Sequence, residues 1–138
     1  MGRNVYLTRR ETFAAAHRLF KPGLSDEDNF KMFGKCSNPN WHGHNYTLEI
    51  TVKGEVNTET GFVIDIKKLK EIIRETVISK VDHKNLNIDT EFMNGIIPTS
   101  ENISIAIWNQ LVNKIPGGKL YSVKLYETEN NYFEYKGE

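Results

Sequence analysis

The segment Cys36-Ser37-Asn38-Pro39-Asn40-Trp41-His42-Gly43-His44-Asn45 runs directly into Tyr46-Thr47-Leu48-Glu49-Ile50-Thr51-Val52. The second segment alternates, with an apolar side chain at every even position, which is typical of a half-buried β-strand. His42 and His44 share the parity of that apolar face, so both imidazoles are expected to point inward at the start of the strand. Gly43 between them removes a side chain and lets the backbone bend. The stretch therefore predicts a metal site at the end of a strand, with a thiol near it.

A third histidine completes the expected site. Val5–His17 is predicted to be a strand, and within it Phe13 and His17 share one face. If the first two strands are neighbours, His17 supplies a third nitrogen beside His42 and His44. Three histidines with an open fourth position are the pattern of a catalytic zinc site. An isolated His-x-His pair is common, so the third inward histidine and the nearby cysteine are what favour metal binding.

Cys36 is the one cysteine of the chain. It is open to three interpretations: a fourth, structural metal ligand, a base or nucleophile, or a small buried hydrophobic residue. Its neighbours Lys35, Ser37 and Asn38 are polar, and a metal close by would favour the ionised thiol. These two points favour a reactive thiolate.

The other elements follow from periodicity and turn signals. A long loop at 21–35 follows the first strand, and after the second strand a turn at 54–61 leads to a strand continuation at 62–65 that makes a hairpin. A helix at about 66–80 is capped by Asp65, and a second helix begins at Pro98-Thr99-Ser100-Glu101 and ends at Pro116-Gly117-Gly118. Two more strands are expected at 120–127 and 132–136. The order ββααββ predicts one α+β domain over residues 1–138. Its expected architecture is a four-stranded antiparallel sheet with both helices on one face. Such a sheet has two open edges, so oligomerisation through them is a reasonable hypothesis.

The composition excludes several classes of protein. Eighteen basic and 18 acidic residues give zero net charge without a basic stripe, which argues against nucleic acid as a partner. No apolar stretch approaches membrane-spanning length, and the N-terminal residues lack the apolar run of a signal peptide. We therefore expect a cytoplasmic protein without a membrane partner, whose single cysteine stays reduced.

Three acidic residues outside the segment of His42 and His44 are also considered as candidates for the site. Asp82-His83 lies in a loop beyond the first helix, and an aspartate beside a histidine can orient it or share a proton, although a solvated loop pair is the simpler interpretation. Glu127 shares the apolar face of its strand with Val123 and Leu125, where a carboxylate is costly unless it is paired. Glu101 fits better as a first-turn helix residue than as a catalytic one.

Taken together, these segments resemble the 6-pyruvoyl-tetrahydropterin synthase family nearly end to end. The resemblance rests on Phe13-Ala14-Ala15-Ala16-His17-Arg18-Leu19, Cys36-x5-His42-Gly43-His44-Asn45, Asp82-His83-Lys84-Asn85-Leu86, Thr99-Ser100-Glu101-Asn102, Glu127-Thr128-x-Asn130-Asn131 and Tyr135-Lys136-Gly137-Glu138. Several ordered motifs that match together are a specific signal. The resemblance implies the tunnelling fold, in which three ββααββ units close their sheets into a barrel and two trimers stack as a homohexamer. It also implies active sites at subunit interfaces, so that Asp82 and His83 serve the thiol of a neighbouring chain.

The resemblance also implies a reaction and roles for the residues. The implied substrate is 7,8-dihydroneopterin triphosphate, and the implied products are 6-pyruvoyl-tetrahydropterin and inorganic triphosphate, as in tetrahydrobiopterin biosynthesis, with no external redox cofactor. By position, the implied roles are Zn²⁺ ligands for His17, His42 and His44, the proton-abstracting base for Cys36, a proton relay for Asp82 and His83, the pterin anchor for Glu127, and the lining of the pterin pocket for Thr99, Ser100 and Glu101. Arg18, Lys35 and Lys84 are cations available to the triphosphate, and the sequence does not choose among them.

Two alternatives remain beside this lyase. The 6-carboxy-tetrahydropterin synthases share the implied fold, zinc site and starting substrate, but typically place the thiol three residues before His-Gly-His. The gap here is five residues, Ser37 to Trp41, which favours the pyruvoyl enzyme. Trp41 departs from the family pattern, because a smaller residue, often Gly, is usual there. The second alternative is a non-catalytic zinc-binding module in which Cys36 closes the site as a fourth ligand.

Overall fold

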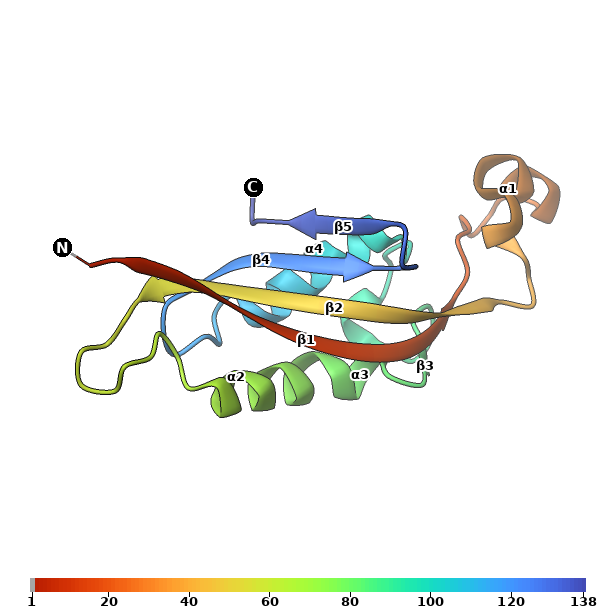
Figure 1. The fold of residues 1–138 in the computed structure, drawn as a ribbon. Helices are drawn as coiled ribbons and strands as arrows, with labels where there is room; N and C mark the ends of the chain where they lie inside the picture. Colours follow the sequence, from red (N-terminus) through yellow and green to blue (C-terminus); the bar gives the residue numbers. More distant parts are fainter. Residues whose placement is uncertain (1) are drawn as a thin grey trace.

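A computed structural model describes residues 2–138 as one mixed β-sheet with helices against one of its faces (Figure 1). The strands are β1 (Asn4–His17), β2 (His42–Glu55), β3 (Lys84–Asn85), β4 (Lys119–Tyr126) and β5 (Tyr132–Tyr135). Their order across the sheet is β3-β1-β2-β4-β5. All neighbours are antiparallel except β3, which runs parallel to β1.

The long β1–β2 pair is built by the alternation seen in the sequence. Tyr46, Leu48, Ile50 and Val52 are fully buried on one face of β2. The register pairs His17 with His42 and Ala15 with His44, so the two strands bring their histidines to the same end of the sheet. The condition for His17 to join His42 and His44, that the first two strands are neighbours, is therefore met.

Two helical segments cover the buried face of the sheet. The first is continuous from α2 (Ile66–Ile73) through a π-helical turn (Arg74–Ile78) to α3 (Ser79–Val81), and the second is α4 (Ser100–Leu111). As predicted, Asp65 caps the first, because its side chain accepts a hydrogen bond from the Lys67 N–H. The fully buried side chains of these helices pack against the inward face of the strands: Leu69, Ile73, Val77, Ile103, Ile107 and Leu111.

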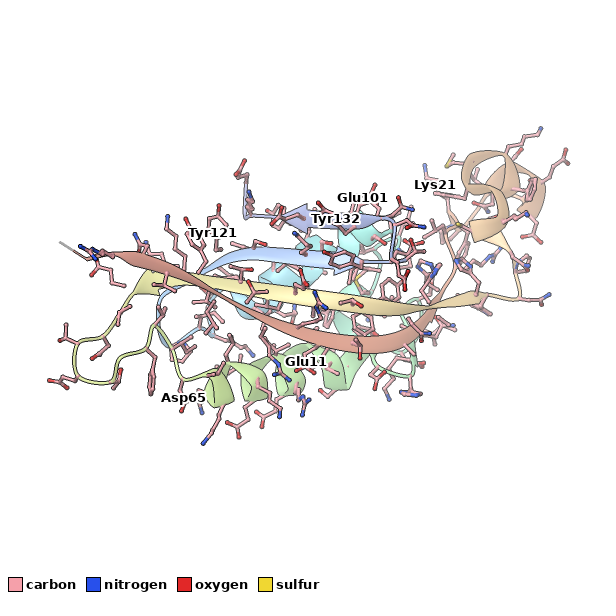
Figure 2. All side chains as sticks on the ribbon, in the orientation of Figure 1. Glu11, Lys21, Asp65, Glu101, Tyr121 and Tyr132 are labelled. Atoms are coloured by element: carbon pink, nitrogen blue, oxygen red, sulfur yellow. The ribbon has the colours of Figure 1, made fainter. Side chains whose placement is uncertain are left out.

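One charged side chain lies inside this interface. Glu11 is on the inward face of β1, only 8% exposed, between the strand and the first helical segment (Figure 2). Its two carboxylate oxygens are held separately, by Arg9 of the same strand at 2.6 Å and by Arg74 of the π-helical turn at 3.1 Å. The two guanidiniums satisfy a carboxylate that would otherwise be costly to bury.

Three details of the predicted architecture are wrong. The sheet has five strands and is mixed, because residues 84–85 add to the free edge of β1 as the parallel strand β3. Residues 62–65 form no strand, although Ile64 is buried against the core. The predicted loop at 21–35 contains α1 (Asp26–Phe33), which is followed by a 3₁₀ turn (Gly34–Ser37) and stands beyond the end of the sheet.

Candidate metal centre and active site

His17, His42 and His44 converge where β1 ends and β2 begins. Their ring centroids are 4.5 to 5.1 Å apart, and one nitrogen from each lies within 4.8 Å of the others. Buried nitrogens of all three rings, including both of His42, have no hydrogen-bond partner among the described residues. Buried polar atoms are normally satisfied, so one unpaired nitrogen from each ring, within 4.8 Å of the other two, fits a bound metal ion. The three histidines are positioned to hold such an ion.

A backbone carbonyl fixes which nitrogen of His17 faces the centre. His17 Nδ1 lies 2.8 Å from the carbonyl oxygen of Pro98, and the hydroxyl of Tyr46 is 3.4 Å from the same nitrogen. Because a carbonyl only accepts, Nδ1 carries the hydrogen and Nε2 keeps its lone pair. This is the outer hydrogen bond that orients a metal-binding histidine.

Burial keeps two of the three rings uncharged. It lowers the pKa of His17 from 6.5 to about 4, although the hydrogen bond to Pro98 opposes the shift and the neighbouring histidines add to it. The pKa of His42 is also lowered, by burial first and by His44 second. Both rings are therefore neutral near pH 7, which is the form that binds a metal.

Gly43 has a different role from the predicted one. The strand runs regularly through it, so the backbone does not need it for a bend. A Cβ at this position would lie only 3.3 Å from the carbonyl oxygen of Ala15 on β1. Glycine therefore allows the two strands to approach closely between the histidine ligands.

Glu127 reaches the centre from the end of β4. One of its carboxylate oxygens lies 3.3 Å from His44 Nε2, and the other accepts a short hydrogen bond from the Ser100 hydroxyl. The side chain keeps 25% of its surface exposed, so the carboxylate is both fixed and accessible. It can accept hydrogen bonds from a ligand that lies beside the metal centre.

The segment that carries Cys36 is tied to the same end of β1. The carbonyl oxygen of Cys36 accepts from the Leu19 N–H at 2.8 Å, two residues beyond His17. The thiol is free and half-buried. Cys36 and Glu127 also oppose ionisation of Tyr46, whose pKa is raised chiefly by burial. The Glu127 carboxylate and the Tyr46 hydroxyl therefore lie beside the histidines, and Cys36 lies on a segment that is tied to the chain just beyond His17.

Asp82 and His83 lie at the edge of β1. Asp82 Oδ1 accepts from the Ala14 N–H at 3.0 Å and lies 3.1 Å from His83 Nδ1. The hydrogen bond from Ala14 is the main reason that the pKa of Asp82 is lowered. The His83 ring is 83% exposed and borders a depression of about 520 Å³ that also reaches His44. Among residues 2–138, no hydrogen bond or ion pair joins Asp82 or His83 to Cys36.

The three predicted pocket residues at the start of α4 have different surroundings. Thr99 is the N-cap and accepts from the Asn102 N–H at 3.2 Å. Ser100 is buried and holds Glu127, whereas Glu101 is exposed in the first turn, as the sequence indicated (Figure 2). The Ser100 hydroxyl therefore binds the Glu127 carboxylate and does not face open space.

Tyr46 and Pro98 are parts of the centre that the sequence did not identify. Tyr46 was assigned only to the core, and its parity with His42 and His44 was the available signal. Pro98 takes part through its carbonyl oxygen, for which no side chain gives a signal.

Comparison with known proteins identifies the family. The family model described as 6-pyruvoyl tetrahydropterin synthase matches residues 6–138. A 6-pyruvoyl tetrahydrobiopterin synthase of Dictyostelium discoideum is 50% identical over 138 residues, which is 100% of both chains. The Homo sapiens protein of that name is 47% identical over 132 residues, 96% of this chain and 91% of its own. The solved structure of Caenorhabditis elegans 6-pyruvoyl tetrahydropterin synthase superposes with a TM-score of 0.92 at 40% identity, covering 99% of this chain and 98% of that one.

The chain therefore belongs to the 6-pyruvoyl tetrahydropterin synthase family, as its motifs indicated. It is an enzyme of the lyase class. Within residues 2–138, no helix combines the length and apolar character needed to cross a membrane.

Proposed function

We propose that this enzyme converts 7,8-dihydroneopterin triphosphate to 6-pyruvoyl-tetrahydropterin and inorganic triphosphate, as in tetrahydrobiopterin biosynthesis, with Zn²⁺ held by His17, His42 and His44. The observation that carries the proposal is the group of three inward histidines with unpaired buried nitrogens, beside a thiol and an accessible carboxylate. Nitrogen ligands without a fourth protein donor suit a zinc that keeps a position for substrate. The family of the chain supports the choice of a pterin substrate.

The position of each residue determines its proposed task in binding or activating the substrate. Glu127 accepts hydrogen bonds from the amino and ring N–H groups of the pterin, and Ser100 holds it in the orientation to do so. We assign Thr99 and Glu101, which flank Ser100 at the start of α4, to the lining of the pterin pocket. A Zn²⁺ held by His17, His42 and His44 would supply a Lewis acid for the hydroxyl oxygens of the substrate side chain and so make the adjoining bonds more acidic. The pterin is thereby anchored at one end and activated at the other.

Proton transfer falls to the thiol and to the His-Asp pair. Cys36, as thiolate, takes the proton from the side-chain carbon of the bound substrate. Asp82 orients His83, which then moves protons during the internal redox shift and the loss of triphosphate. The shift is internal to the substrate, so the reaction needs no external redox cofactor.

The placement of His83 supports an assembled enzyme. Its exposed ring makes no hydrogen bond or ion pair with Cys36 within residues 2–138, so it is accessible to a second copy of the chain. We propose a homohexamer of two stacked trimers, located in the cytoplasm, in which Asp82 and His83 of one copy serve Cys36 of the next. Mixing a Cys36→Ala chain with a His83→Ala chain tests this arrangement, because mixed oligomers regain activity only if sites are shared.

Product identification tests the reaction. Purified protein is incubated with 7,8-dihydroneopterin triphosphate, with and without a chelator, and the products are identified by mass. We expect 6-pyruvoyl-tetrahydropterin and triphosphate, and their loss after chelation. A 6-carboxy product assigns the chain to the carboxy-type reaction instead, and the absence of both turnover and pterin binding identifies a non-catalytic zinc module.

A cysteine variant tests the role of the thiol. Cys36→Ala is expected to retain zinc and to lose triphosphate release by roughly a hundredfold or more, because proton transfer by a positioned group contributes factors of that order. Met32→Ala, which removes an exposed side chain of α1 just before the turn, is the control for disturbance of this segment. Unchanged turnover in Cys36→Ala refutes the role of the thiol as base, and loss of zinc makes it a ligand.

A further inference from the structure

Trp41 has a backbone conformation that L-residues rarely adopt. Its φ is +66°, and the only other non-glycine residue with a positive φ between residues 2 and 138 is His83. The left-handed region is energetically unfavourable for a bulky residue, whereas glycine or asparagine fits there readily. Trp41 directly precedes His42, and its N–H donates to the Asn38 carbonyl at 3.0 Å. Such strain at a site indicates that the surrounding structure holds the residue in place.

The indole ring is held by contacts with Phe20. The two rings meet edge to face with centroids 6.5 Å apart, and both border a hollow of about 230 Å³ whose wall includes Ile88 and Ile97. The guanidinium carbon of Arg18 lies 4.1 Å from the centroid of the Phe20 ring. Arg18, Phe20 and Trp41 thus form a continuous contact, which we call the Arg18–Trp41 stack.

Arg18 connects this stack to the thiol. Its Nε donates to the Ser37 carbonyl at 2.8 Å, next to Cys36, and its other end pairs with Asp26 at 3.1 Å. Its own N–H and carbonyl are clamped by the Asn87 side chain at 2.9 Å each. The Arg18 side chain is only 12% exposed and has the Phe20 ring against its face, so its guanidinium is engaged in contacts within the protein. It is not free to hold the triphosphate of the substrate.

The stack joins the three segments that carry the site. Arg18 follows the ligand His17, the Ser37 carbonyl follows Cys36, and Trp41 precedes the ligand His42. We propose that the Arg18–Trp41 stack is a positioning device that sets the place of the Cys36 thiol relative to the three histidines. The inference deepens the proposed function, on which it rests only for the chemical task of the thiol.

Thiol labelling tests the stack without any substrate. Because Cys36 is the only cysteine, alkylation of the zinc-loaded protein by iodoacetamide reports this position alone. Trp41→Asn removes the ring but keeps a residue that tolerates positive φ, and Trp41→Phe keeps an aromatic ring against Phe20. We expect Trp41→Asn to raise the labelling rate about fivefold, since the segment opens more often, and Trp41→Phe to restore most of the wild-type rate.

Controls separate positioning from general loosening. Zinc content and thermal unfolding are measured for each protein, and Phe62→Ala, which removes an exposed aromatic ring far along the chain, is expected to leave the labelling rate unchanged. Arg18→Lys keeps the charge but loses the flat guanidinium face, so it is expected to resemble Trp41→Asn.

Wild-type labelling in both Trp41→Asn and Arg18→Lys overturns the proposal. A rise that Phe62→Ala reproduces also overturns it, because the effect is then not specific to the stack. If the proposed reaction holds, Trp41→Asn and Arg18→Lys are expected to lower kcat by a larger factor than they change KM. Failure of the reaction itself leaves the labelling result intact.

Discussion

Protonation of His17 is expected to destabilise the metal-free protein as the pH falls. The ring is 1% exposed, and burial lowers its pKa from 6.5 to about 4. Between these values the unfolded chain binds a proton that the folded chain refuses, so the free energy of unfolding decreases with decreasing pH. The stabilising effect of the neutral ring is complete above pH 6.5 and is lost as the pH approaches 4.

The size of the effect follows from the shift. Each pH unit between 6.5 and 4 removes about 1.4 kcal/mol of stability, which amounts to about 3 kcal/mol over the whole interval. His42, whose pKa is lowered as well, adds to the slope in the same direction. For a domain of ordinary stability, a loss of this size is a substantial part of the total.

The assay is urea unfolding of chelator-treated protein at several pH values between 4 and 7.5. His17→Asn removes the titrating ring, and its amide N–H₂ can still donate toward the Pro98 carbonyl. We expect this variant to lose most of the pH dependence that the wild type shows, while His83→Asn, on an exposed side chain, keeps it. An equal slope in wild type and His17→Asn refutes the reasoning, because other groups then cause the acid sensitivity.

Two further predictions concern stability alone. Thr99→Ala removes the side chain that caps α4, and we expect a loss of about 1 kcal/mol in urea unfolding; no loss would show that the Asn102 N–H finds another acceptor. Glu11→Ala leaves the Arg74 guanidinium without its buried partner, and a loss of about 2 kcal/mol is expected. Glu71→Ala, which breaks a pair with Lys68 whose side chains are 62% and 59% exposed, is its control and is expected to cost no more than about 1 kcal/mol; equal costs would contradict the burial argument.

Much of the fold could be predicted because it follows side-chain periodicity. The parity of residues 46–52 fixed one face of β2, and the stripe that includes Ile103 and Ile107 marked α4. The strand β3 could not be predicted, since two polar residues, Lys84 and Asn85, have no pattern of their own and join the sheet only because the edge of β1 is free there.

The errors at 21–35 and 62–65 have a common physical cause. Helix α1 begins with a good cap, the Ser25 hydroxyl accepting from the Asp28 N–H, but its only buried residue is Asn29, so no apolar stripe marked it as a helix. Conversely, Ile64 is apolar and buried without being in a strand. Apolar periodicity reports burial, and these segments separate burial from secondary structure.

The histidines of the site were predictable, while their surroundings were not. Parity alone placed His17, His42 and His44 on one inward face, because side chains alternate strictly along paired strands. The Pro98 carbonyl and the left-handed backbone of Trp41 depend on how distant segments meet, and no residue type encodes either.

The site and the core share one structural device, with opposite consequences for stability. The inward face that buries Tyr46 and Leu48 continues into His42 and His44, so the candidate metal ligands are an extension of the hydrophobic face. Burial lowers the pKa of His17 and of His42 and so keeps these two rings neutral and ready to bind, but it also leaves ring nitrogens without hydrogen-bond partners, which costs stability in the metal-free protein. A metal ion bound there would satisfy those nitrogens only in the folded state, so it would stabilise the fold by the same contacts that the proposed reaction uses.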